Sequence, residues 1–184
     1  MPYAGIVLAG GAARRLSGVD KPGLVVGGCS LLARAVAAAG GAEPLVVVGP
    51  QRPGHDGVVW TREPVPGTGP VAALAAGLAL VPATAEVVVL LAADLPGVRR
   101  STVDRLRTAR ENRSADGALL VDEQGERQWL LGAWRVAALR AALPEPPENA
   151  SLRRTLGGLS LVDVRAEPGE SEDIDTPGDL ERHR

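Results

Sequence analysis

The chain has 184 residues, 45% of them hydrophobic, and a formal net charge of −2, which favours one globular domain and excludes a disordered or fibrous protein. This charge gives no support to a nucleic-acid-binding protein, and the single cysteine, Cys29, excludes an internal disulfide. No apolar run reaches the roughly 20 residues of a membrane helix, and no charged leader precedes the first one, so we expect a cytoplasmic protein without a membrane partner.

Short apolar runs alternate with helix-like segments in the first half of the chain. Strands are predicted at 4–10, 44–49, 57–61 and from 85 to about 91, and helices at 30–40 and 70–81. Ser30 can cap the first of these helices, Gly40 can end it, and Pro70 suits the first turn of the second.

The second half continues with helices at 100–112, 136–143, 151–158 and 176–184, and with strands at 117–126, 127–135 and 159–165, a turn joining the first two of these strands. Continuous Val/Leu runs are typical of strands that are buried on both faces of a parallel sheet. The alternation predicts an α/β fold, a doubly wound and mostly parallel sheet in a single domain over residues 1–184. In such sheets ligands bind beyond the carboxyl ends of the strands.

The loop after the first strand contains "AGGAARRLSGVDKPG", residues 9–23, and it holds Lys21, the only lysine of the chain. Its glycines fit neither G-x-G-x-x-G nor the P-loop pattern, which weakens the dinucleotide-binding and ATPase interpretations. Gly10 and Gly11 nevertheless permit close backbone approach, and Arg14, Arg15 and Lys21 supply positive charge. We interpret the segment as a phosphate-binding loop, the alternative being an ordinary exposed basic loop.

Acidic residues offer candidate metal ligands in two other segments. Asp94 follows a long apolar run, where a carboxylate can bind Mg²⁺, although Asp94 could equally belong to a simple turn before Pro96 and Gly97. Asp173 and Asp175 alternate, so they share one side of an extended segment and could complete the metal site. Capping of the last helix is an equally good explanation for Asp175.

The stretch "REPVPGTGP", residues 62–70, predicts a glycine-rich entry into a helix. The free amides of that helix start could bind a nucleobase or an anionic group, or the stretch could be an ordinary strand-to-helix turn. No serine or cysteine has a visible base partner, so nucleophilic catalysis is not expected.

Taken together, the blocks "LAGGAARRLSGVDK", "GPVAAL", "AADLPG", "QWLLGAWR", "SLRRTL" and "DIDTPGDL" resemble, in this order, the nucleotidyltransferases that complete the molybdenum cofactor. The resemblance covers almost the whole chain and is closest to the guanylyltransferases. It implies a Rossmann-like domain that transfers GMP from GTP to the terminal phosphate of molybdenum-bearing molybdopterin, giving the guanine dinucleotide cofactor and pyrophosphate.

The resemblance also implies roles for individual residues. Nucleotide binding would involve Leu8, Ala9, Gly10, Gly11, Arg15, Lys21, Glu63 and Gly69. Arg15, Lys21 and Asp94 would be the catalytic residues. Mg²⁺ would bind Asp94 and Asp175, with Asp173 toward the acceptor or the metal.

Other functions remain open at this point. Within the same class, the chain could be a cytidylyltransferase for the same cofactor or act on another small phosphorylated acceptor. A noncatalytic nucleotide sensor and a nicotinamide-dependent oxidoreductase are alternatives from other classes, the latter disfavoured by the missing G-x-G-x-x-G. The expected partners are GTP, a molybdopterin-type acceptor and a transient molybdoenzyme or cofactor-delivery protein.

Overall fold

A computed structural model describes residues 2–10, 20–174 and 178–179. The strands are β1 (Ala4–Leu8), β2 (Val25–Val26), β3 (Cys29–Ser30), β4 (Leu45–Val48), β5 (Val59–Thr61), β6 (Val87–Ala92), β7 (Gly117–Val121), β8 (Arg127–Arg135) and β9 (Leu161–Arg165). The helices are α1 (Leu31–Ala38), α2 (Pro70–Leu78), α3 (Arg100–Arg113), α4 (Val136–Ala142) and α5 (Leu152–Leu156), with one 3₁₀ turn, η2 (Lys21–Gly23).

Seven strands form the central sheet in the order β5-β4-β1-β6-β8-β7-β9. β5, β4, β1 and β6 are parallel, β8 is antiparallel to both β6 and β7, and β9 is parallel to β7. From β1 the chain first moves outward to β4 and β5 and then crosses back to β6 on the other side of β1. This change of direction makes the carboxyl ends of β1 and β6 the topological switch point of the sheet.

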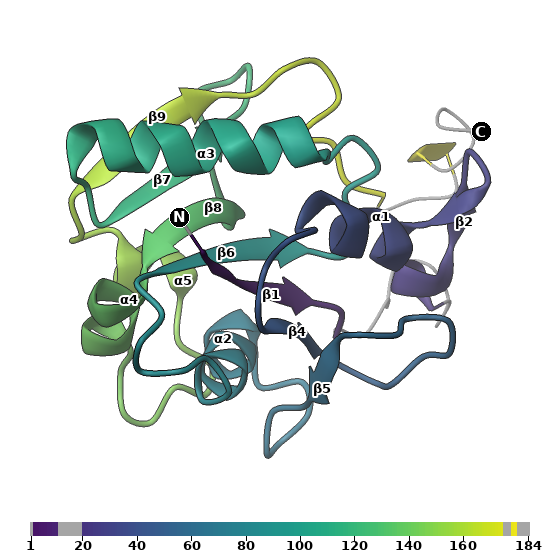
Figure 1. Ribbon diagram of the computed structural model, residues 1–184, viewed down its shortest axis with the longest axis horizontal. Coiled ribbons are helices and arrows are strands. Elements are labelled where there is room, and N and C mark those ends of the chain that lie inside the picture. The colour runs from purple at the N-terminus through teal and green to yellow at the C-terminus, as the bar shows by residue number, and fades with distance from the viewer. Residues whose placement is uncertain (1, 11–19, 175–177, 180–184) are drawn as a thin grey trace.

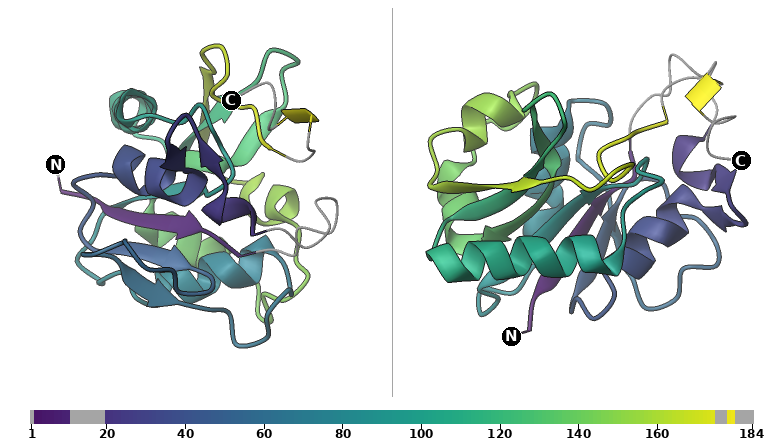
Figure 2. Two further views of the ribbon diagram at one scale, coloured as in Figure 1. Left: turned by 90° about the vertical axis from the view of Figure 1, so that its right-hand side faces the viewer. Right: turned by 90° about the horizontal axis from the view of Figure 1, so that it is seen from above.

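Helices cover both faces of the sheet (Figures 1 and 2). Alternate residues of β1 point to opposite faces, as strand geometry requires. Val7 packs in the core beneath α1 and α3, whereas Ile6 and Leu8 pack beneath α2, α4 and α5. The prediction of a doubly wound, mostly parallel sheet is therefore confirmed.

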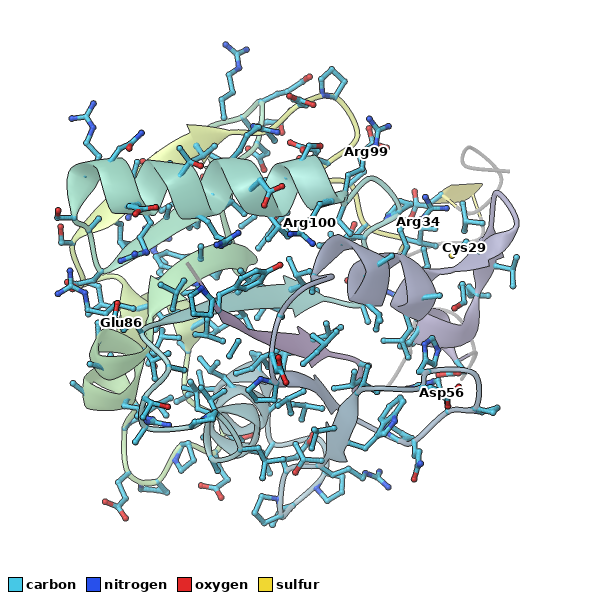
Figure 3. The ribbon with its side chains drawn as sticks, viewed as in Figure 1. Cys29, Arg34, Asp56, Glu86, Arg99 and Arg100 are labelled. Carbon is cyan, nitrogen blue, oxygen red and sulfur yellow. The ribbon has the colours of Figure 1, made fainter. Side chains whose placement is uncertain are left out.

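A small hairpin of β2 and β3 lies beside α1, and the sequence did not predict it. Arg34 of α1 donates a hydrogen bond to the Val26 carbonyl at 2.8 Å, which ties the hairpin to the helix (Figure 3). Ile174, from the far end of the chain, is buried against Val26 and Leu31. The segment near the C-terminus thus packs on residues that directly follow the glycine-rich loop.

The predicted helix starts agree with the observed ones. The Ser30 side chain accepts a hydrogen bond from the Ala33 amide and caps α1, and Pro70 stands in the first turn of α2. The expected terminal helix at 176–184 lies almost wholly outside the described residues. In the described ranges, no helix combines the length and the apolar composition that crossing a membrane requires.

Candidate active site

A cavity of about 520 Å³ opens at the switch point, where the loops after β1 and β6 meet the start of α2. Its lining comes from six separate parts of the chain, which the fold brings to one edge of the sheet. The lining residues are Leu8, Gly10, Lys21, Pro22, Glu63, Gly67, Gly69, Pro70, Ala73, Ala92, Ala93, Asp94 and Leu130. The cavity thus lies where α/β proteins of this topology bind their ligands.

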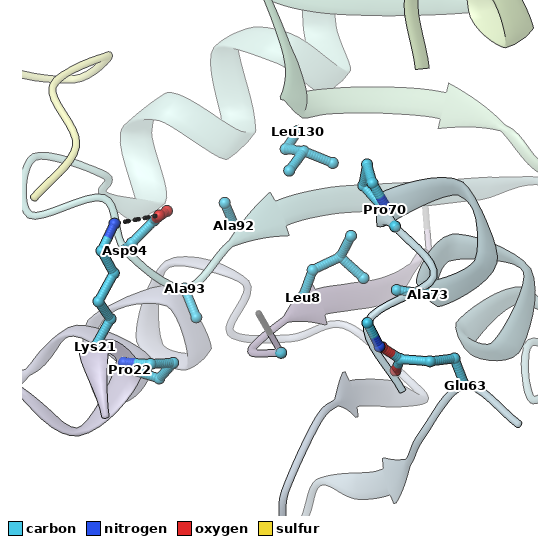
Figure 4. A pocket seen from close by; sticks show the side chains of 13 residues that line it. Leu8, Lys21, Pro22, Glu63, Pro70, Ala73, Ala92, Ala93, Asp94 and Leu130 are labelled. Atoms are coloured by element: carbon cyan, nitrogen blue, oxygen red, sulfur yellow. Dashed lines mark hydrogen bonds and ion pairs between the residues drawn. The ribbon is translucent and has the colours of Figure 1, made fainter. Parts of the chain in front are cut away.

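One end of the cavity carries a pair of opposite charges (Figure 4). The Lys21 Nζ atom lies 3.7 Å from Asp94 Oδ2, and the two side chains are 15% and 31% exposed. Lys21 begins the 3₁₀ turn η2, and Asp94 follows β6 by two residues. Lys21 is the one cation among the described lining residues, so the cavity offers a negatively charged ligand its favourable contact at this end.

The opposite end is formed by Glu63 and the backbone that enters α2 (Figure 4). The Glu63 carboxylate accepts a hydrogen bond from the Gly67 amide at 3.3 Å. Gly69 precedes Pro70 at the start of the helix with φ of +100°, a conformation that L side chains rarely adopt. Leu8, Ala92 and Leu130 lie between the two ends and give the cavity an apolar floor.

A bidentate ion pair holds the loop from which Lys21 projects. The Arg52 guanidinium donates to both oxygens of Asp20, from Nε at 2.9 Å and from Nη2 at 2.5 Å. It also donates to the carbonyls of Pro50 and Ala9, at 2.9 and 3.4 Å. The hydrogen bond from Arg52 lowers the pKa of Asp20 below its ordinary value, outweighing the partial burial that raises it.

A buried carboxylate anchors the segment that leads to Ile174. The Glu170 carboxylate is buried and accepts hydrogen bonds from Thr102 Oγ1, Arg105 Nη1 and the Glu167 amide. Burial raises the pKa of Glu170, but these three donors outweigh it and leave the pKa below its ordinary value. Four residues later, the Ile174 amide donates to the Asp94 carbonyl at 3.3 Å, so the segment reaches the edge of the cavity.

The structure brings together six of the residues that the sequence singled out: Leu8, Gly10, Lys21, Glu63, Gly69 and Asp94. Ala9 does not line the cavity; its side chain is buried in the core and its amide pairs with the Val48 carbonyl. Asp173 is exposed beside Ile174 and is not part of the lining. Gly11, Arg14, Arg15 and Asp175 lie outside the described residues.

Some residues of the site were not singled out individually from the sequence. Leu130 reaches the cavity because β8 pairs with β6 in antiparallel register, and Ala73 because α2 packs on the same face of the sheet as Leu8. Arg52 stands in a Gly/Pro-rich loop that matches no motif. Leu130 stands in the block "QWLLGAWR" and Ala73 in the block "GPVAAL", and these blocks are the signals that could have directed attention to them.

Asp94 suits a magnesium ion that is shared with a ligand. Among the described residues, no three His, Cys, Asp or Glu side chains gather as a metal-binding group. Mg²⁺ usually keeps several waters and binds one or two carboxylates together with substrate phosphates, so a single protein carboxylate on the wall of a ligand-sized cavity fits it.

Comparison with known proteins agrees with this geometry. Residues 5–164 match the MobA-like NTP transferase domain. The chain is 37% identical over 140 residues to the molybdenum cofactor guanylyltransferase of Bradyrhizobium sp. (strain ORS 278), a match that covers 72% of this chain and 66% of that protein, just under two thirds of its length. It is 30% identical over 188 residues to the molybdenum cofactor guanylyltransferase of Rhodobacter capsulatus, covering 99% of this chain and 95% of that protein.

A solved structure shares the fold over the full chain. The 2-C-methyl-D-erythritol 4-phosphate cytidylyltransferase of Thermus thermophilus superposes with a TM-score of 0.76 at 19% identity, covering 100% of this chain and 97% of that one. This likeness shows the fold alone. Because a cytidylyltransferase has the same architecture, the architecture does not determine which base is bound.

Proposed function

This chain belongs to the MobA-like NTP transferase family, and we propose that it transfers GMP from GTP to the terminal phosphate of molybdenum-bearing molybdopterin and releases pyrophosphate. The observation that carries the proposal is the cavity at the switch point, with Lys21 and Asp94 at one end and Glu63 and the start of α2 at the other. The two relatives named as molybdenum cofactor guanylyltransferases support guanine as the base and molybdopterin as the acceptor.

The reaction requires no general base from the protein. An oxygen of the acceptor phosphate attacks the α-phosphorus of GTP, the bond from that phosphorus to the bridging oxygen breaks, and pyrophosphate leaves with the bonding electrons. A phosphate monoester is already an anion near neutral pH, so no proton must be removed first. The protein accelerates this step by positioning two anions and offsetting their charge.

The two ends of the cavity bind different parts of the donor nucleotide. Lys21, and Arg15 by the family resemblance, hold the phosphates of the donor. The base and ribose lie toward Glu63 and Gly69, where a carboxylate and a turn of backbone provide hydrogen-bonding groups. Leu8 and Gly10 contact the nucleotide from the end of β1, with Ala9 and Gly11 beside them in the chain.

We also propose magnesium dependence. Asp94, with Asp175, would hold the ion, and Asp173 would lie toward the acceptor or the metal. When bound, Mg²⁺ supplies positive charge that stabilises the phosphates as the α-phosphorus is attacked. The ammonium group of Lys21, 3.7 Å from Asp94, offsets the negative charge of that carboxylate, which would otherwise repel a polyanionic ligand.

Two finer points stay predictions from the sequence. One is a cytoplasmic location. The other is delivery of the acceptor by a transient molybdoenzyme or cofactor-delivery protein.

Thermal unfolding with single nucleotides tests the proposal. GTP, CTP, ATP, UTP and NAD are each added with and without Mg²⁺, and the unfolding temperature is measured. A ligand at about 100 times its dissociation constant stabilises the folded state by about 2.7 kcal/mol, which moves the unfolding temperature by several degrees. We expect GTP with Mg²⁺ to give the largest shift. A shift with CTP alone would change the product to a cytosine dinucleotide, and a shift with NAD alone would contradict the nucleotidyltransferase proposal.

Release of pyrophosphate separates an enzyme from a nucleotide sensor. GTP, Mg²⁺ and molybdenum-bearing molybdopterin are incubated with the protein, and pyrophosphate is measured. We expect release only when GTP and the acceptor are both present. Tight GTP binding without pyrophosphate release would support the sensor instead.

A further inference from the structure

Arg52 lies outside the cavity, but it contacts two residues of the glycine-rich loop, one at the start of the loop and one just before Lys21. Its guanidinium binds the Asp20 carboxylate through Nε and Nη2, and Nη2 also reaches the Ala9 carbonyl at 3.4 Å. Ala9 and Asp20 flank the sequence from 10 to 19, and Lys21 is the next residue along the chain. One side chain therefore joins the end of β1 to the residue that precedes the cavity's lysine.

The bonds of Arg52 argue against a direct contact with substrate. A guanidinium carries five N–H donors, and four are used by Asp20, Ala9 and Pro50. The Arg52 side chain is only 14% exposed, whereas its partner Asp20 is 56% exposed. Arg52 is also absent from the cavity lining. A guanidinium so fully engaged by protein oxygens is suited to holding backbone in place.

Arg52 contributes more to the position of Asp20 than to the position of Ala9. The Ala9 amide already pairs with the Val48 carbonyl at 2.8 Å, and the Ala9 side chain is buried in the core. Asp20 lies at the surface, and its carboxylate bonds to Arg52 through both oxygens. Loss of Arg52 would therefore release Asp20 and the start of η2, where Lys21 begins the turn, rather than the end of β1.

We propose that Arg52 is a positioning residue for the donor nucleotide, which acts through Asp20 to hold Lys21 at the phosphate end of the cavity. The inference rests on the proposed function, since it takes the ligand to be a nucleoside triphosphate. A planar guanidinium can bind a carboxylate with two parallel bonds and still reach a carbonyl, and an ammonium cannot reproduce this fork.

The test compares Arg52→Gln with the wild type in titration calorimetry of the full chain, using GTP, guanosine and inorganic triphosphate as separate ligands with Mg²⁺ present. We expect Arg52→Gln to weaken GTP and triphosphate binding by about tenfold, the low end of the effect of one charge-assisted hydrogen bond because Asp20 is largely exposed. Guanosine affinity should not change, since guanosine has no phosphate for Lys21 to contact. General damage to the fold would weaken the binding of all three ligands. Unchanged guanosine affinity therefore distinguishes a selective effect on phosphate binding from such damage.

Further variants test whether Arg52 acts on nucleotide binding through Asp20. Asp20→Asn should weaken GTP binding to a similar extent, and the double variant Asp20→Asn with Arg52→Gln should be no weaker than either single one. Arg127→Gln is the matched control, because Arg127 makes a similar bidentate bond to Asp163 away from the cavity. If Arg52→Gln does not fold, Arg52→Lys keeps the charge without the fork and should show the same selective loss.

The outcomes separate the two proposals. If the wild-type chain binds no nucleoside triphosphate, the proposed function fails and this inference fails with it. If the wild type binds GTP and Arg52→Gln binds it equally well, only the role of Arg52 is overturned. Equal losses of affinity for GTP and guanosine, or additive losses of GTP affinity in the double variant, would likewise overturn the role of Arg52.

Discussion

Lys21 and Asp94 come from loops far apart in the sequence, and the structure places them 3.7 Å apart at the same edge of the sheet. Their proximity was predictable, because each follows a parallel strand and the carboxyl ends of such strands meet at one edge. The role of Arg52 was not predictable in the same way. Its partners are Asp20 and Ala9, 32 and 43 residues away, and a single arginine in a loop gives no pattern that points to them.

The chemistry of Lys21 gives a prediction at this scale. Lys21→Arg keeps the charge but replaces a compact ammonium with a planar fork, in a position that is only 15% exposed and next to Asp94. We expect both Lys21→Arg and Lys21→Ala to lower the rate of pyrophosphate release by about 100-fold or more, as does removal of one electrostatic stabiliser. The rate is measured at saturating GTP and acceptor, with unfolding temperature as the control for folding. Near-normal activity of Lys21→Arg would show that charge alone suffices.

At the scale of elements, most helices and strands were predictable because their signals are local. Ser30 caps α1, Pro70 begins α2, and short uninterrupted apolar runs form β1, β4 and β6. The hairpin of β2 and β3 was missed because strands of two residues carry no periodicity. The packing of Ile174 on that hairpin was missed because nothing local connects residues so distant in the sequence.

The Glu170 anchor between α3 and the C-terminal segment predicts a pH-dependent stability. Its pKa is lower in the folded chain than in the unfolded chain, so ionised Glu170 stabilises the fold above the unfolded pKa, about 4.3, and this contribution is lost as pH falls through the folded pKa. We expect Glu170→Gln to cost about 2 kcal/mol at pH 7, the contribution of a buried hydrogen-bonded carboxylate.

Urea unfolding at pH 7 and at pH 4 measures this effect. The difference between wild type and Glu170→Gln should be largest at pH 7 and smaller at pH 4, because the wild-type carboxylate begins to protonate on unfolding there. Glu167→Gln is a suitable control, since the Glu167 carboxylate pairs with the same Arg105 but is mostly exposed. A difference that does not change with pH would contradict the assigned charge state of Glu170.

At the scale of the whole molecule, one sheet runs from β5 to β9, and its two cores lie on opposite faces of the same strands. Strand alternation and unbroken apolar runs made this architecture predictable, but not the antiparallel insertion of β8 between β6 and β7. The direction of β8 is set by how the chain turns back after β7. The composition of β8 does not encode that direction.

The single domain expected over residues 1–184 stays a prediction, and its test is cooperative unfolding. Trp60 lies in β5 near one edge of the sheet, whereas Trp129 and Trp134 lie in β8 toward the other. In Trp60→Phe, tryptophan fluorescence therefore reports β8, and far-UV circular dichroism reports the whole chain. We expect the two urea transitions to coincide. Separate midpoints would show two independently unfolding units.

The packing of Ile174 has a practical meaning for protein engineering. Its amide donates a hydrogen bond to the carbonyl of Asp94, a residue that lines the cavity. A bulky label attached beside Ile174, for example at the exposed Asp173, would therefore stand at the edge of the cavity and compete for space with the proposed acceptor. β1 begins at Ala4 and its carboxyl end faces the cavity, so the opposite, N-terminal end is the better place for a tag (Figure 2).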